Sequence, residues 1–326
     1  MLDVVCAGLL AAALVRFLIF GARCGWRWIP VDHPNARSLH DNPVPRGGGL
    51  AVLLSVFAVA AISVKFSFSI APAMLLLTAI SYRDDLRSLP ASLRLSVHFA
   101  AGLWFAASIG GEWWQFASVT LILAAAANIT NFMDGANGLV GGVMLICFGA
   151  MGLFAAAGEQ YDLATICFAT AGATAGFLIF NVPGGRIFLG DAGSVPLGFL
   201  GAAISFIGIE REVWPPSVPL LLFMPLYADA LLTLIRRLLR GERVWEAHRE
   251  HAYQRLVQSG WPHHRVAAVY ALATLITAVL GAASTNWNRS AQLTMLLSCV
   301  LVLFLLLSAI HHRWRIRQDA VSPNDF

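Results

Sequence analysis

Residues 116–157 of the chain read FASVTLILAAAANITNFM, then DGAN, then GLVGGVMLICFGAMGLFAAA. The first and third pieces, residues 116–133 and 138–157, are mostly apolar, and the piece between them is short and polar. Because an α-helix of about 20 apolar residues spans the hydrocarbon core of a bilayer, each long piece predicts a transmembrane helix. The polar turn between them then lies at a membrane surface.

The same alternation continues in both directions along the chain. It predicts an all-α, polytopic transmembrane bundle of about eleven helices, at roughly 2–20, 48–64, 68–82, 93–110, 116–133, 138–157, 162–180, 193–209, 216–236, 265–284 and 291–311. The first segment is interpreted as a helix and not a cleaved signal, because no small-residue cleavage pattern follows it. Without a linker or clear repeat, residues 1–326 are expected to form a single domain.

Composition excludes a water-soluble protein. Of the 326 residues, 58% are hydrophobic and 12% are charged, with a mean hydropathy of +0.70. A soluble domain carries roughly 25% charged residues. The five cysteines form no CxxC pair, so neither a disulfide framework nor a zinc site is expected.

The basic residues predict the orientation in the membrane. One alternating set of loops and helix edges holds 18 of the 22 Lys and Arg residues, and cytoplasmic loops are enriched in these residue types. We therefore expect the N-terminus outside and the C-terminus in the cytoplasm. Beyond this topological role, the loop arginines could contact lipid headgroups or substrate phosphates.

Five polar regions interrupt the apolar pattern, and all lie in the loops expected in the cytoplasm or at the adjoining helix ends. The first region, residues 32–49, contains Arg37 and Arg46 among prolines and glycines. Arginine suits forked contacts with phosphate, so these two are candidate phosphate ligands. The alternative is an ordinary basic loop.

The second region contains the adjacent acids Asp84 and Asp85, followed by Arg94. Paired carboxylates repel each other and are costly at a membrane edge, so they favour magnesium-dependent chemistry or proton handling. The alternative is a solvated turn in which Arg83 and Arg87 are the counter-ions.

The third region ends the helix expected at 116–133. Asn128, Asn131 and Asp134 are spaced three apart and so share one helix face. Gly135 and Gly138 would let a ligand approach the backbone. Hydrogen bonds between helices are the alternative use of the amides.

The fourth region, residues 188–194, places Asp191 at a glycine-flanked helix start, where an N-cap is the alternative to a ligand role. In the fifth region, His248, Arg249 and His251 could contact a diphosphate. Alternatively, Glu246, Glu250 and the nearby arginines could form a solvated amphipathic helix. Asp229, inside the ninth segment, could pair with a buried polar group or act in function.

No phosphate-binding P-loop, dinucleotide GxGxxG or GxSxG nucleophile motif is present in the sequence. Carboxylate and amide oxygens favour Mg²⁺, with Mn²⁺ as the substitute, over zinc. Nucleic acid is not an expected partner.

Taken together, the polar regions resemble those of the polyprenyl-phosphate N-acetylhexosamine-1-phosphate transferases, bacterial glycosyl transferase family 4. The matching pieces are Asp84-Asp85, Asn128-x-x-Asn131-x-x-Asp134-Gly135-x-Asn137-Gly138-Leu139, Gly190-Asp191-x-Gly193-Ser194 and His248-Arg249-x-His251. The residues from Asp32 to Gly49 and the His248 region look most like the branch that initiates O-antigen. The triple-histidine cluster of the peptidoglycan branch is absent, which argues against a UDP-muramyl-pentapeptide donor.

The resemblance implies a multi-pass enzyme of the bacterial inner membrane, with its active site on the cytoplasmic face. It would transfer N-acetylhexosamine 1-phosphate from a UDP-sugar to undecaprenyl or another polyprenyl phosphate and release UMP. A homo-oligomer is left open. The implied roles are catalysis for Asp84 and Asp85; magnesium binding for Asp191 and Asn131; nucleotide binding for Asp134, Gly135, Asn137 and Phe188; and phosphate binding for Arg94, His248, Arg249, His251, Arg37 and Arg46.

Two other classes compete. A transporter or flippase also carries many helices and buried carboxylates, but more often places them near the membrane midplane. A non-catalytic lipid-binding scaffold would not need the Asn and Asp face. For the transferase we expect single displacement, since a lipid phosphate with a second pKa near ~6 is already an anion. A covalent aspartyl-phosphate is the alternative.

Overall fold

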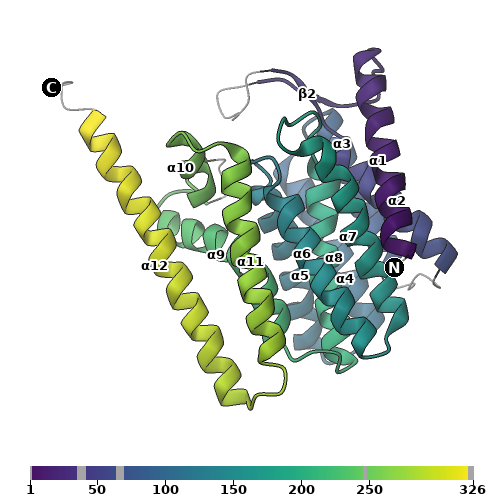
Figure 1. Ribbon diagram of the computed structural model, residues 1–326, viewed down its shortest axis with the longest axis vertical. Coiled ribbons are helices and arrows are strands. Elements are labelled where there is room, and N and C mark those ends of the chain that lie inside the picture. The colour runs from purple at the N-terminus through teal and green to yellow at the C-terminus, as the bar shows by residue number, and fades with distance from the viewer. Residues whose placement is uncertain (1, 35–41, 64–69, 245–247, 322–326) are drawn as a thin grey trace.

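The computed structural model describes residues 2–34, 42–63, 70–244 and 248–321. The described chain is an all-helical bundle with one small hairpin (Figure 1). Its elements are α1 Leu2–Arg23, β1 Val31–Asp32, β2 Val44–Pro45, α2 Gly48–Ser63, α3 Ala71–Leu86, α4 Ala91–Ile109, α5 Trp113–Met133, α6 Leu139–Ala157, α7 Tyr161–Asn181, α8 Asp191–Glu210, α9 Ser217–Leu239, α10 Ala252–Gln258, α11 His263–Ala283 and α12 Arg289–Val321.

The all-α prediction is confirmed, and each of the eleven expected segments coincides with a helix. Within the described residues, eight helices are long and apolar enough to cross a membrane. The sequence did not predict the antiparallel pair β1–β2 or the short α10. Helix α12 also continues past the expected end at 311, and its added turns carry polar residues.

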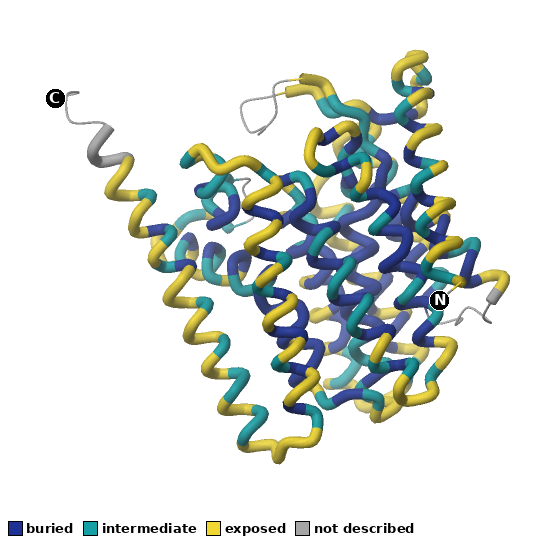
Figure 2. The backbone as a smooth tube through the Cα atoms, in the orientation of Figure 1, coloured by how far each residue is buried: buried dark blue, intermediate teal, exposed yellow. Residues whose placement is uncertain are grey.

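Helix α8 is the most enclosed of these candidate spans, and it packs against α2, α3 and α5. Small residues make this close packing possible, as they do between membrane helices generally. A Cβ built on Gly49 would lie 2.1 Å from the Gly193 Cα, so the start of α2 can approach the start of α8 only because both residues are glycine. Figure 2 shows the buried interior around α8 and the contrasting exposure of α12.

The polar regions, as far as the structure describes them, gather at one end of the bundle (Figure 1). This end carries the β1–β2 hairpin, the C-terminal ends of α3 and α5, the start of α8, and α10. The chain segments there are tied by main-chain hydrogen bonds: Gly48 N–H donates to Phe188 O at 3.0 Å and Phe188 N–H donates to Pro45 O at 2.9 Å. The chain segments that contain the first and fourth polar regions therefore lie side by side.

Candidate active site

Asp85 links three of the polar regions. It is contributed by α3, but its carboxylate accepts hydrogen bonds from the main-chain N–H groups of Asp191 at 3.2 Å and Ala192 at 3.0 Å. The first N–H groups of a helix have no partner within that helix, so a carboxylate from elsewhere can satisfy them. Arg46 adds an ion pair with the Asp85 carboxylate at 3.4 Å, and the Asp85 side chain is fully buried.

Arg46 is thereby placed at the site by two acids. Its guanidinium pairs with Asp32 at 3.0 Å as well as with Asp85, and its side chain keeps 32% of its surface exposed. Arg46 therefore offsets carboxylate charge and still has exposed surface for a phosphate. The second predicted arginine of this region, Arg37, lies outside the described residues.

Asp84 faces a different cation from its neighbour. Its carboxylate accepts from Arg94 at 2.9 Å and from the Leu89 N–H at 2.5 Å. Arg94 also reaches the Asp191 carboxylate at 3.6 Å. The solvated-turn alternative with Arg83 and Arg87 is thus wrong: α3 continues through the pair to Leu86, and the counter-ions are Arg46 and Arg94.

Asp191 is where the second, third and fourth regions converge. Its carboxyl lies within hydrogen-bonding reach of both the Asp84 carboxyl and the Asn131 side chain. Asp191 is the first residue of α8, and the N-cap position belongs to Gly190, so the N-cap alternative is wrong. The two predicted magnesium ligands, Asp191 and Asn131, therefore do lie together.

Asn128 and Asn131, which share one face of α5, have neighbours on two different helices. Asn128 donates to Ala124 O at 2.8 Å and pairs with Nδ1 of the buried His98 on α4 at 2.9 Å, which is an interhelical contact. Asn131 approaches Asp191, one turn closer to the polar end. Asp134 is the C-cap of α5. Burial, together with the nearby carboxylates of Asp191 and Asp85, raises the pKa of Asp134 well above its usual range.

Gly135 packs against protein, contrary to the expected approach of a ligand to its backbone. A Cβ on Gly135 would lie 2.2 Å from the Tyr253 hydroxyl, which donates to Phe132 O at 3.1 Å. Gly138 adopts a left-handed conformation, with φ of 81°, directly before α6. The proposed nucleotide-binding role of Gly135 stays a prediction.

Asn137 and Phe188 are held in adjoining loops. The Asn137 side chain packs against Gly185, three residues before Phe188. Asn181 joins the two loops, since its Oδ1 accepts from Gly138 N–H at 2.6 Å and its Nδ2 donates to Ile187 O at 2.9 Å. The sequence interpretation missed Asn181, although a buried amide at the end of an apolar segment was a visible signal.

His263 was also missed. It is half-buried at the start of α11, and its Nδ1 accepts from the Asn137 main-chain N–H at 3.2 Å. Its neighbour His264 is exposed. The difference follows from helix geometry, since adjacent helical residues point about 100° apart.

The fifth region joins the site through α10. His251 is the N-cap of α10, and the buried Asp229 accepts from the N–H groups of Ala252 at 2.7 Å and Tyr253 at 3.1 Å. Asp229 therefore has a structural partner. The described residues 248–251 are not helical, so the amphipathic-helix alternative is wrong for them.

Burial favours the neutral form of both histidines of this region. Burial, the neighbouring His251 and Arg237 lower the pKa of His248 to about 4. Burial is also the main reason that the pKa of His251 is lowered. These imidazoles can donate or accept hydrogen bonds, but a positive charge toward a phosphate would have to come from arginines such as Arg249.

The donor set fits magnesium. Among the described residues, no group of three or more His, Cys, Asp or Glu side chains is arranged to hold a metal ion by itself. Mg²⁺ in phosphoryl-transfer sites binds through one or two carboxylates, with substrate phosphates and water completing its shell. Asp191 and Asn131 offer oxygen ligands, and the crowding of Asp134 with Asp85 and Asp191 is a charge excess that a divalent cation would offset.

Gly135→Ala is expected to destabilise the protein by about 1–3 kcal/mol, because its Cβ would overlap the Tyr253 hydroxyl. The measurement is the thermal unfolding midpoint of the detergent-solubilised protein. Tyr253→Phe in the same chain removes the overlapping oxygen and should restore part of the loss. An unchanged midpoint in Gly135→Ala would show that this contact is not close-packed.

The chain is similar in sequence to proteins of one transferase family. Residues 67–209 match the sequence model of glycosyl transferase family 4, and this stretch contains Asp84, Asp85, Asn131, Asp134 and Asp191. The chain is 24% identical to a probable undecaprenyl-phosphate N-acetylglucosaminyl 1-phosphate transferase of Bacillus subtilis, over 84% of this chain and 82% of the relative. It is 27% identical to an undecaprenyl-phosphate alpha-N-acetylglucosaminyl 1-phosphate transferase of Yersinia pestis, over 88% and 85% respectively.

A second group of relatives matches over a shorter length. A phospho-N-acetylmuramoyl-pentapeptide-transferase of Bacillus pumilus is 33% identical over 54% of this chain and 53% of its own length. The matched segment is thus about half of that relative. The expected resemblance is confirmed by these matches, while the branch within the family is not decided by them.

Proposed function

We propose that the chain is a member of glycosyl transferase family 4, whose sequence model matches residues 67–209, and that it transfers an N-acetylhexosamine 1-phosphate from a UDP-sugar to undecaprenyl or another polyprenyl phosphate, releasing UMP. The observation that carries this proposal is the convergence of Asp84, Asp191 and Asn131 beside Arg94 at one end of the bundle. In the proposed setting this end faces the cytoplasm at the bacterial inner membrane, and the product initiates O-antigen or a related envelope glycan.

The location of the acids argues against a transporter or flippase. Asp84 lies near the C-terminal end of α3 and Asp191 begins α8. These helix ends lie at the end of the bundle that also carries the β1–β2 pair and α10 (Figure 1). Carboxylates of a transport pathway are typically found near the membrane midplane, in discontinuous helices.

The reaction joins two anions. An oxygen of the polyprenyl phosphate attacks the phosphorus that carries the sugar, the bond from that phosphorus to the bridging oxygen breaks, and UMP leaves with the electron pair. A bound magnesium ion would supply charge neutralisation at the diphosphate. Arg94, Arg46 and Arg249 would supply the remaining positive charge from the protein.

The two catalytic candidates differ in what they can do. Both carboxylate oxygens of Asp85 are engaged by the start of α8, and its side chain is fully buried. Asp84 is slightly exposed and neighbours Asp191. We therefore assign acceptor orientation to Asp84 and organisation of the site to Asp85. Because the acceptor is already an anion, no strong base is required.

UMP release should depend strictly on the acceptor. Purified protein mixed with UDP-N-acetylhexosamines and Mg²⁺ should release UMP and form lipid-linked sugar only when polyprenyl phosphate is added. The measurement is rapid-quench analysis of delipidated protein with labelled donor. A stoichiometric burst of UMP without acceptor, with label on the protein, would establish a covalent intermediate, and no UMP from any donor with acceptor present would reject the transferase function.

A further inference from the structure

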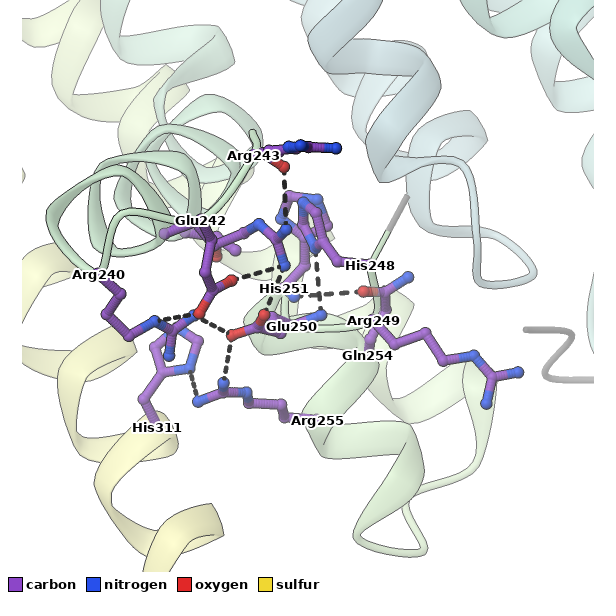
Figure 3. Close-up of polar contacts among 12 residues, drawn as sticks. Arg240, Glu242, Arg243, His248, Arg249, Glu250, His251, Gln254, Arg255 and His311 are labelled. Carbon is purple, nitrogen blue, oxygen red and sulfur yellow. Dashed lines mark hydrogen bonds and ion pairs between the residues drawn. The ribbon is translucent and has the colours of Figure 1, made fainter. Parts of the chain in front are cut away.

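The segment from His248 to His251 is non-helical and lies between α9 and α10, so something other than a helix must hold it. Figure 3 shows what surrounds it: a network of charged side chains centred on Glu250. The Glu250 carboxylate accepts from Arg237 at 2.7 Å, from Arg240 at 2.5 Å and from Arg255 at 3.2 Å. Three arginines before and after the segment thus converge on its third residue.

Two of these arginines are buried, which makes their pairing important. The side chains of Arg237 and Arg255 are only 8% and 6% exposed. A buried guanidinium that loses its carboxylate partner is strongly destabilised. Arg237 has a second acid, Glu242, at 3.0 Å. For Arg255, Glu250 is the one acid found within ion-pair distance among the described residues.

The network continues into the C-terminal helix. Arg255 also contacts Nδ1 of His311 at 2.5 Å and lies 4.5 Å from the ring centroid of Trp314, and both residues belong to α12. The rest of α12 is largely exposed, and only 6% of its 18-residue apolar stretch is buried within the protein. Glu250 and Arg255 therefore connect this exposed helix to the segment that carries His248 and Arg249.

The same segment is positioned against the active site. Its next residues begin α10, where Tyr253 donates to Phe132 O at the end of α5. Within the segment, the Glu250 N–H donates to His248 Nδ1 at 3.4 Å, and the rings of His248 and His251 lie 4.8 Å apart. A shift of Glu250 would move His248 and Arg249 relative to Asp134 and its neighbours.

We propose that Glu250 is a positioning residue for the transfer reaction: by binding Arg237, Arg240 and Arg255 together, it holds His248 and Arg249 where they meet substrate phosphate. This rests on the proposed function. The negative charge is needed because three cations surround the carboxylate, and charge from Arg240 and Arg237 lowers the pKa of Glu250 in spite of its partial burial. Glutamine in its place would retain the shape but not the charge.

The test compares two matched variants of the full-length protein. Glu250→Gln is expected to reduce kcat on the order of 100-fold, which is the effect of displacing a phosphate-contacting group by about 1 Å. Glu242→Gln is the control, because Glu242 pairs with Arg237 and Arg240 but lies outside the segment. It should change kcat less than about threefold. Equal losses in both variants, or a normal kcat in Glu250→Gln, would overturn the proposal.

A double-mutant cycle separates positioning from general stability. If Glu250 acts through His248 and Arg249, then adding Glu250→Gln to a variant that carries both His248→Ala and Arg249→Ala should slow the reaction no further. A further loss of kcat in that variant would mean that Glu250 acts independently of these two residues and would reject the positioning role.

Hydrogen exchange gives a readout that does not depend on turnover. Peptides covering residues 248–258 should exchange faster in Glu250→Gln than in Glu242→Gln, with the remaining helices unchanged. If the wild-type protein released no UMP, the proposed function would fail, and this exchange difference would still decide whether Glu250 holds the segment. Equal exchange rates in the two variants would show that Glu250 does not hold the segment.

Discussion

Asp191→Asn should lower turnover by on the order of 10³-fold, the scale expected when a group that stabilises transition-state charge is removed. Asp191 is the point at which Asp84, Asn131 and Arg94 meet, so it is the best-placed carboxylate for magnesium. The change should not unfold the protein. The carboxylates of Asp84 and Asp85 repel the charge on Asp191, and asparagine removes that repulsion.

The measurement is initial rate against magnesium concentration, together with the thermal unfolding midpoint of each variant. Asp162→Asn is a suitable control, because Asp162 is an acid at the start of α7 that pairs with Arg211 away from the site. We expect normal turnover from the control and an equal or higher midpoint from Asp191→Asn. Near-normal turnover of Asp191→Asn at saturating magnesium would remove Asp191 from the metal site.

Asp85→Asn should cost both activity and stability. Asparagine keeps one acceptor oxygen but loses the other, and it cannot form the ion pair with Arg46. Breaking a buried pair and leaving its partner uncompensated costs about 3–5 kcal/mol. Because Arg46 is partly exposed and also pairs with Asp32, the free energy of unfolding should fall by about 2 kcal/mol. The start of α8 should shift, and turnover should fall about 100-fold.

Asp84→Asn is the informative comparison for this prediction. It removes a carboxylate that accepts hydrogen bonds from Arg94 and from the Leu89 N–H. Unlike Asp85, this carboxylate accepts none from the first N–H groups of α8. It should slow turnover with a smaller drop in the unfolding midpoint than Asp85→Asn. If both variants lost equal stability, or if Asp85→Asn unfolded no earlier than wild type, the different roles assigned to the two acids would be wrong.

The helices of this protein are determined by local sequence. An apolar segment of membrane-spanning length must satisfy its backbone hydrogen bonds internally, so it becomes a helix whatever its neighbours are. That is why all eleven expected segments were found, including 116–133 and 138–157. The five polar regions were visible for a similar reason: Asp84, Asp134 and Asp191 are too costly at apolar helix ends to be incidental.

The partner of each polar side chain was decided only by tertiary structure. The sequence treats Asp84 and Asp85 as equivalent neighbours, yet adjacent positions on α3 point in different directions, so one meets Arg94 and the other meets the start of α8. Likewise, the regular spacing of Asn128 and Asn131 does not reveal that α4 covers the first and α8 approaches the second.

Glu250 is the clearest example of a residue whose partners could not be predicted from the sequence. In the sequence it is one acid among several arginines, and its importance arises because α9, α10 and α12 bring Arg237, Arg255 and His311 to one place. Local sequence determined that this chain is a bundle of membrane helices with its polar chemistry at helix ends. The packing of those helices decided which charges meet, because Coulomb and hydrogen-bond energies depend on distances between residues that are far apart in the chain.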